Sequence, residues 1–153
     1  MSSEMLDVIY FYSKENLYGE LSNFYRCDFY LDSKKWMTVE HYFQASKFLN
    51  NASYMEKIRL SNTPKIARQL GQSRKVEMVD NWDDIKENVM RKALQAKFLN
   101  NKKLAELLLG TAEKSLVEAS PYDSYWGCGS DGSGENRLGA LLMELRSSLN
   151  SGE

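Results

Sequence analysis

Apolar positions recur every three or four residues over most of the chain, which is the period of an α-helix with one buried face. The clearest stripe lies near the C-terminus, where five leucines share one helical face: Leu138, Leu141, Leu142, Leu145 and Leu149. A second stripe steps through residues 82–96, and Asn81 is a suitable N-cap for it. The pattern therefore predicts two amphipathic helices in the second half of the chain.

Capping signals predict three shorter helices. Thr38 is a plausible N-cap for a helix through Phe48, and Glu40 lies in its first turn, where the helix dipole favours a carboxylate. Residues 64–70 begin with proline and residues 102–109 form a further apolar run. Each of these two segments is followed by a glycine, which is typical of a helix end.

Segments with the composition of β-strands are few and short. Residues 8–12 and 27–31 are rich in β-branched and aromatic side chains, and residues 116–119 form a third candidate strand. A polar turn at residues 32–35 precedes Trp36 and Met37, which begin a return strand. The predicted fold is α+β: compact and predominantly helical, with a small β-sheet.

Length and composition predict one globular domain. The 153 residues are 42% hydrophobic and 27% charged, so we expect a single domain over residues 1–153 with its core at about residues 8–149. With a net charge of -1, the chain lacks the excess of basic residues that is typical of a dedicated nucleic-acid binder. The net charge does not argue against a local basic cleft. No signal peptide or membrane span is recognisable, and two cysteines give no disulfide framework, so we expect a cytoplasmic protein without membrane association.

The single histidine limits the chemistry. His41 follows Glu40 in the predicted helix, roughly 100° around its axis. It is either a structural, hydrogen-bonded residue or the base of a nucleophilic arrangement, and the former is favoured. A site with several histidine ligands is excluded, and no calcium-binding spacing is present, so no metal is predicted.

A glycine-rich segment precedes the last helix. Its residues 127–132 match G-x-G-x-x-G formally, but no second strand can follow, so a dinucleotide-binding fold is rejected. Four of the nine glycines nevertheless lie between Gly127 and Gly134. They form either a phosphate-binding loop or a tight connection without a ligand. Trp126 favours the first alternative, because an aromatic face beside the loop suits a base or a sugar.

A second cluster lies around the helix that begins at Thr38. Glu40, Gln44 and Lys47 are spaced as i, i+4 and i+7, which gives either a solvated ladder or a polar stripe within a site. Aromatic residues are dense around Glu40, and a carboxylate among aromatic rings is suited to acid–base chemistry. We predict that this cluster and the glycine-rich segment form one active site.

Three ordered motifs carry a family resemblance. They are WMTVEHYFQASKF at residues 36–48, preceded by LSNF; NVMRKALQAKF at residues 88–98; and DSYWGCGSDGSGENRLGALLMELR at residues 123–146. The chain resembles the YbiA-like proteins, also called the NADAR superfamily, from about Ile9 to Leu149.

The resemblance implies a compact, mainly helical fold and an N-glycosidase that needs no metal or other cofactor. Its substrates would be small phosphoribosyl or ADP-ribosyl N-glycosides, such as the ribosylamino-pyrimidine 5′-phosphates formed early in riboflavin biosynthesis. The alternatives are an ADP-ribosyl-guanine hydrolase that acts on ADP-ribosylated nucleic acid, and a non-catalytic module that binds ADP-ribose or a nucleotide.

The candidate site residues follow from these clusters and the resemblance. Glu40 is the candidate that stabilises positive charge at C1 or orients water, and Asp123 is the second catalytic carboxylate. Acid and base roles stay unassigned between the two. As an alternative, Lys97 and Arg146 are surface or structural cations. The candidate substrate-binding residues are Asn23, Phe24, Phe43, Lys97, Trp126, Gly127, Gly129, Asn136 and Arg146.

Overall fold

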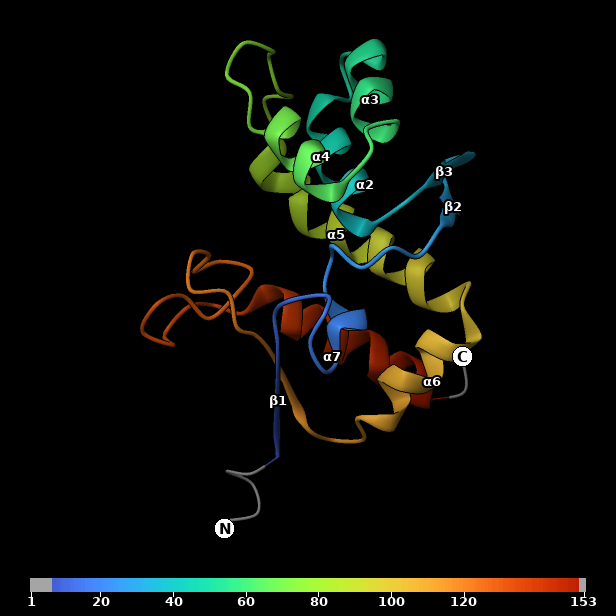
Figure 1. Cartoon of the computed structure of the whole chain (residues 1–153), viewed down its shortest axis with the longest axis vertical. Coiled ribbons are helices and arrows are strands. Elements are labelled where there is room, and N and C mark those ends of the chain that lie inside the picture. Colours follow the sequence, from blue (N-terminus) through green and yellow to red (C-terminus); the bar gives the residue numbers. More distant parts are fainter. Residues whose placement is uncertain (1–6, 152–153) are drawn as a thin grey trace. The chain divides into compact units, whose positions relative to one another are not determined.

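The computed structural model describes residues 7–151, which divide into two compact units. The central unit is Asn23–Asn100, and the terminal unit combines residues 7–22 with residues 101–151. Each unit has its own two-stranded sheet and its own helices (Figure 1). The single domain expected from the sequence stays a prediction.

The terminal unit is built around a parallel strand pair. Strand β1 (Val8–Phe11) pairs with β4 (Ser115–Glu118), and Val8 lies opposite Ser115. Helix α7 (Arg137–Asn150) packs on β4, and α6 (Lys102–Gly110) packs on α7. A short 3-10 helix, η1 (Gly19–Leu21), precedes the central unit along the chain. The leucine stripe of α7 is largely buried, as its spacing predicts.

The central unit contains a β-hairpin and the longest helix of the described residues. Strands β2 (Phe29–Leu31) and β3 (Lys34–Trp36) are antiparallel, with Phe29 opposite Trp36. The turn residues Asp32 and Ser33 both have positive φ, as in the two-residue turns that suit hairpin twist. Helix α5 (Trp82–Leu99) contacts β2.

Three short helices complete the central unit. Helix α2 (Val39–Ala45) continues into the 3-10 helix η2 (Ser46–Phe48) and contacts α3 (Ala52–Arg59), α4 (Pro64–Gly71) and α5 (Figure 1). Because neighbours cover it from several sides, all seven residues of α2 are buried, including Glu40, His41 and Gln44. The polar side chains of α2 therefore lie inside the unit, which excludes the solvated-ladder alternative for Glu40 and Gln44.

The predominantly helical α+β fold is confirmed, with three differences in detail. The return strand β3 begins at Lys34 rather than at Trp36, because the turn consists only of Asp32 and Ser33. The strands form two separate sheets rather than one, because β1 pairs with β4 and β2 with β3. Helix α3 was not among the predicted elements. Only Ile58 of its eight residues is buried, and Tyr54 and Met55 are its only other large apolar side chains, so its apolar stripe is short. Asn81 occupies the N-cap of α5 as predicted, but its side chain makes no capping hydrogen bond.

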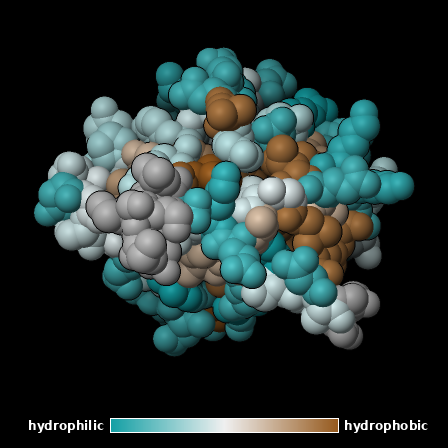
Figure 2. All heavy atoms as spheres, turned by 90° about the horizontal axis from the view of Figure 1, so that it is seen from below, coloured by the Kyte–Doolittle hydropathy of each residue, from teal (hydrophilic) through white to brown (hydrophobic). Residues whose placement is uncertain are grey.

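The surface is mixed in polarity. Figure 2 shows one face of the molecule, on which hydrophilic residues surround separate apolar patches. No helix within residues 7–151 has the length and hydropathy needed to cross a membrane.

Candidate active site

The start of α2 is fixed by two hydrogen bonds to its first turn. The Thr38 hydroxyl accepts the backbone N–H of His41 at 3.1 Å, which is the N-cap bond that the sequence predicts. The N–H of Glu40 donates to the carbonyl of Asn23, also at 3.1 Å. The two predicted motifs of this region, LSNF and the Thr38 helix, are therefore joined through the backbone of two candidate site residues.

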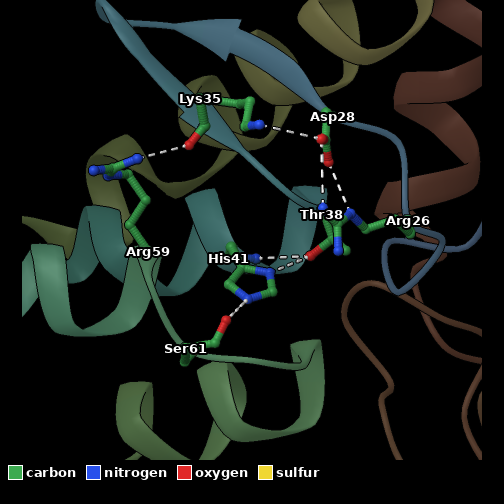
Figure 3. A network of polar contacts seen from close by, with 7 residues as sticks. All are labelled: Arg26, Asp28, Lys35, Thr38, His41, Arg59 and Ser61. Atoms are coloured by element: carbon green, nitrogen blue, oxygen red, sulfur yellow. Dashed lines mark hydrogen bonds and ion pairs between the residues drawn. The ribbon is translucent and has the colours of Figure 1, made fainter.

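His41 has a structural environment. Its ring is fully buried and lies between Thr38 and the Ser61 carbonyl (Figure 3). Because a carbonyl only accepts, Nε2 carries the proton and donates to Ser61 at 3.1 Å, and Nδ1 accepts from the Thr38 hydroxyl at 2.8 Å. Burial lowers the pKa of the ring below 6.5. Both ring nitrogens are engaged, which agrees with the favoured structural interpretation of His41.

Glu40 is a buried carboxylate held through one oxygen. Its Oε2 accepts from Gln44 Nε2 at 2.7 Å and from Arg68 Nε at 3.0 Å, and Glu40 is only 3% exposed. The ion pair with Arg68 compensates part of the cost of burying a charge. Within residues 7–151, Oε1 makes no hydrogen bond. The side chain is therefore fixed in place while one oxygen stays available for chemistry.

Aromatic rings contact the two cations near Glu40, Arg68 and Lys47. The Phe24 ring lies 4.5 Å from the Arg68 guanidinium, close enough for a cation–π contact. The Phe43 ring packs edge-on against Trp82 at 5.1 Å and lies 5.9 Å from the Lys47 ammonium.

Lys47 brings a second cation near Glu40. Its Nζ donates to the Gly71 carbonyl at 3.4 Å. Burial lowers its pKa most, the Glu40 charge raises it, and the Arg68 charge lowers it further. Lys47 therefore interacts electrostatically with both members of the Glu40–Arg68 pair.

Two buried amide oxygens in the central unit lack hydrogen-bond partners within the described residues. Asn23 Oδ1 is one, although its Nδ2 donates to Met90 Sδ at 3.6 Å. Gln44 Oε1 is the other, and its Nε2 is committed to Glu40. A buried acceptor without a donor is costly and is often associated with function.

Lys97 is buried in α5. It is 1% exposed, and its ammonium lies 5.6 Å from the Tyr25 ring and 5.2 Å from the Phe98 ring. Its role is therefore not that of a solvated surface cation.

The glycine-rich segment folds into a ladder of backbone hydrogen bonds. The Cys128 N–H donates to Glu118, the Gly129 N–H donates to Ser120 at 3.1 Å, and the Gly127 carbonyl accepts from Asn136. Gly129 has φ of 74°, a conformation that glycine adopts readily. Because the Gly129 amide already has a partner, an anion would have to displace the Ser120 carbonyl to bind it.

Asp123 and Trp126 begin this segment. Asp123 Oδ1 accepts the N–H groups of Tyr125 and Trp126 at 2.9 and 2.8 Å, which is a local turn motif. Its Oδ2 has no hydrogen bond among the described residues. The Trp126 ring is half-buried and packs edge-on against Tyr125 at 4.9 Å.

Asn136 and Arg146 make several structural hydrogen bonds in the terminal unit. Asn136 donates to the Leu116 carbonyl and accepts the Glu118 N–H, both at 2.9 Å, which ties the start of α7 to β4. Arg146 donates to the Thr111 hydroxyl and the Lys114 carbonyl, beside the end of α6. Burial lowers the pKa of Arg146.

The structure brings part of the candidate set together. Asn23, Phe24 and Glu40 are joined by the contacts described above, and Phe43 and Lys97 belong to the same central unit. The terminal unit holds the others: Asp123, Trp126, Gly127, Gly129, Asn136 and Arg146. A single site built from both groups stays a prediction.

Sequence reasoning missed Arg68, which pairs with Glu40. The two residues are 28 positions apart and on different helices, so no local spacing could reveal the pair. Arg68 occurs in an ordinary short helix, and nothing in its flanking residues marks it as functional.

Comparisons with known proteins agree with the motifs. The chain is 49% identical to N-glycosidase YbiA of Escherichia coli over 142 residues, which cover 93% of this chain and 88% of that protein. It is also 38% identical to riboflavin biosynthesis protein VVA0006 of Vibrio vulnificus over 148 residues, covering 97% of this chain and 40% of the longer protein.

The fold matches a solved structure as well. The NMR structure of the E. coli protein YbiA superimposes with a TM-score of 0.86, covering 94% of this chain and 86% of that one. The sequence model of the NADAR domain matches residues 10–150. The chain therefore belongs to the NADAR domain family.

Proposed function

We propose that this protein is an N-glycosidase that hydrolyses the C1–N bond of phosphoribosyl N-glycosides, with ribosylamino-pyrimidine 5′-phosphates as substrates. Water adds to C1, the C1–N bond breaks, and the leaving nitrogen takes a proton. The products are ribose 5-phosphate and a free amine. Support comes from relatives named as an N-glycosidase and as a riboflavin biosynthesis protein.

The bonding of Glu40 is the observation that carries the proposal. The transition state at C1 resembles an oxocarbenium ion, so a fixed anion nearby stabilises it. Glu40 is buried and is anchored through Oε2 by Gln44 and Arg68. Its Oε1 is then the oxygen that faces the developing charge or orients the attacking water.

The other candidates support this role in distinct ways. Asn23 Oδ1, a buried acceptor without a partner in residues 7–151, suits a ribose hydroxyl. Phe24 and Phe43 supply aromatic surface for the sugar or the base. Lys97 keeps its proposed contact with substrate.

In the terminal unit the proposed roles are more constrained. Asp123 retains a free Oδ2 among the described residues, and Trp126 retains its proposed stacking role. Asn136 uses both its amide oxygen and its amide nitrogen in structural hydrogen bonds, so binding substrate would require it to share or exchange them. Arg146 uses only Nη1 in its two hydrogen bonds, so its Nε and Nη2 groups keep donors for the proposed contact. The Gly129 amide, like Asn136, would have to share or exchange its hydrogen bond, whereas the Gly127 amide keeps its proposed phosphate contact.

Glu40→Gln tests the catalytic assignment. The substitution keeps the side-chain length but removes the charge, so we expect kcat to fall by roughly 10²- to 10³-fold. The assay measures release of ribose 5-phosphate from the ribosylamino-pyrimidine 5′-phosphates. Wild-type turnover in Glu40→Gln would exclude the role.

Glu56→Gln is the matched control. Glu56 also pairs with an arginine, Arg59, at 2.7 Å, but it is half-buried on α3 rather than enclosed in α2. We expect this control to retain activity. An equal loss in both variants would mean that the assay reports a general loss of structure. ADP-ribosylated guanine, offered to the same proteins with release of ADP-ribose as the readout, measures how far the substrate range extends.

A further inference from the structure

Arg68 has donors that the fold does not use. Its Nε donates to Glu40 Oε2 at 3.0 Å, and this is its one hydrogen bond within residues 7–151. A guanidinium carries five N–H groups, so the four on Nη1 and Nη2 remain. The side chain is 49% exposed, which makes these groups accessible from solvent.

Arg59 shows how a purely structural arginine in this unit is bonded. Its Nε and Nη2 both donate to Glu56. Its Nη1 donates to the Lys35 carbonyl, as Figure 3 shows. Its side chain is 19% exposed and lies over the Trp36 ring. Arg59 and Arg68 thus each contact an aromatic ring and each pair with a carboxylate. Of the two, only Arg68 has no hydrogen bond on either terminal nitrogen.

The orientation of Arg68 is fixed before any ligand arrives. Its guanidinium lies over the Phe24 ring at 4.5 Å while Nε is held by Glu40. Two contacts of different kinds restrict the rotation of a side chain that is otherwise flexible. A fixed guanidinium fork is well suited to phosphate, which it binds through two parallel hydrogen bonds.

The local charge also favours an anion. Two cations, Arg68 and Lys47, interact with the single carboxylate of Glu40. The cluster therefore has a net positive charge of one, and part of it is removed from solvent. An anionic group at the unbonded edge of Arg68 would compensate this excess.

We propose that Arg68 binds the 5′-phosphate of the substrate through its Nη groups while its Nε holds Glu40 in position. This assignment rests on the proposed N-glycosidase activity and adds the residue that selects phosphorylated ribosides. The anion would thereby be placed beside the carboxylate that acts at C1, and one side chain would link substrate recognition to catalysis.

A substrate comparison tests the proposal. Kinetics are measured for wild type, Arg68→Gln and Arg68→Lys with a ribosylamino-pyrimidine 5′-phosphate and with the same riboside lacking phosphate. We expect Arg68→Gln to raise KM for the phosphorylated substrate by roughly 10- to 100-fold. Loss of the Arg68–Glu40 hydrogen bond should instead lower kcat on both substrates. Arg68→Lys keeps the charge but loses the planar guanidinium, so its KM for the phosphorylated substrate should lie between those of wild type and Arg68→Gln.

Arg59→Gln is the control, because it removes an arginine of similar surroundings that has no unbonded terminal nitrogen. It should affect the two substrates equally. Equal losses of kcat/KM on both substrates for Arg68→Gln would overturn the proposal and leave Arg68 as a positioning residue for Glu40.

A binding measurement separates this proposal from the proposed activity. Ribose 5-phosphate and ribose are titrated into wild type and Arg68→Gln, with amide chemical shifts as the readout. We expect wild type to bind ribose 5-phosphate more tightly than ribose, and Arg68→Gln to lose that preference. Retention of the preference in Arg68→Gln overturns the assignment, even if no riboside tested is hydrolysed.

Discussion

Glu40 and Asp123 are bonded in the same way, although they belong to different units. Each carboxylate accepts two N–H groups on one oxygen and leaves the other without a hydrogen bond in the described part of the chain. The partners of Glu40 are side chains from α2 and α4, whereas those of Asp123 are backbone amides of its own turn. The side-chain position of Glu40 therefore depends on the packing of α4 against α2, whereas that of Asp123 depends only on its own turn.

Asp123→Asn separates the two roles of that residue. The amide oxygen can still accept the Tyr125 and Trp126 N–H groups, so we expect the melting temperature to stay unchanged while kcat falls. Asp123→Ala removes the acceptor as well and costs about 1 kcal/mol of stability. Thermal melts and ribose 5-phosphate release measure the two effects.

Asp131→Asn is the control within the same loop. Asp131 Oδ1 also accepts a backbone N–H two residues on, from the exposed Ser133. It should retain both stability and activity. Full activity in Asp123→Asn would leave Asp123 with a turn-forming role alone.

Among the elements, α2 and α4 approach each other closely at one glycine. A Cβ on Gly71, the last residue of α4, would overlap Gln44 Oε1 and lie 2.7 Å from Gln44 Cδ. Gln44 in turn donates to Glu40. The absence of a side chain at Gly71 thus permits the packing that holds the catalytic candidate.

Gly71→Ala should therefore damage both stability and catalysis. The methyl group displaces the Gln44 side chain, so we expect a loss of about 1–3 kcal/mol in the free energy of unfolding and a lower kcat. Denaturant melts and the glycosidase assay measure these effects.

Gly110→Ala provides the matched control, because Gly110 also ends a helix but has nothing within 4 Å of an added Cβ. It should be neutral or slightly stabilising, since alanine favours helix more than glycine does. If the two variants behaved alike, the close approach at Gly71 would not be what stabilises the α2–α4 contact.

Sequence periodicity predicted the elements that have a strong apolar stripe or a clear cap. Helices α5 and α7 have long stripes, and Thr38 caps α2 as expected. Helix α3 was not predicted because its apolar stripe is short, and only Ile58 of the helix is buried. For the site, the motifs indicated Asn23, Phe24 and Glu40. Arg68 could not be found, because its partner is set by the packing of α4 on α2.

At the scale of the whole molecule, His41 makes folding stability depend on pH. Burial lowers the pKa of the folded ring below its ordinary value of 6.5. The unfolded chain then binds a proton at a higher pH than the folded protein does. The stabilisation is fully present above about pH 6.5 and is lost as the pH falls from there through the lower pKa of the folded state.

Two measurements check this expectation. The free energy of unfolding should decrease between about pH 7 and pH 5, above the range in which most carboxylates titrate. Because His41 is the only histidine, its imidazole NMR signals report its protonation directly. They should show a neutral ring with the proton on Nε2 at pH 7. A ring that titrates at 6.5 or above would contradict the expectation.

The parallel pairing of β1 with β4 has a consequence for synthesis on the ribosome. Strand β1 is made first, but its partner begins at Ser115, after the whole central unit has been translated. At bacterial or eukaryotic elongation rates the delay is roughly 5–20 s. The central unit is continuous in sequence and can fold during this interval, whereas the Val8–Phe11 segment must wait without its partner. Strand β1 thus leaves the ribosome well before its partner and is among the last of the described elements to be paired, so the Val8–Phe11 segment is exposed to chaperones during this interval.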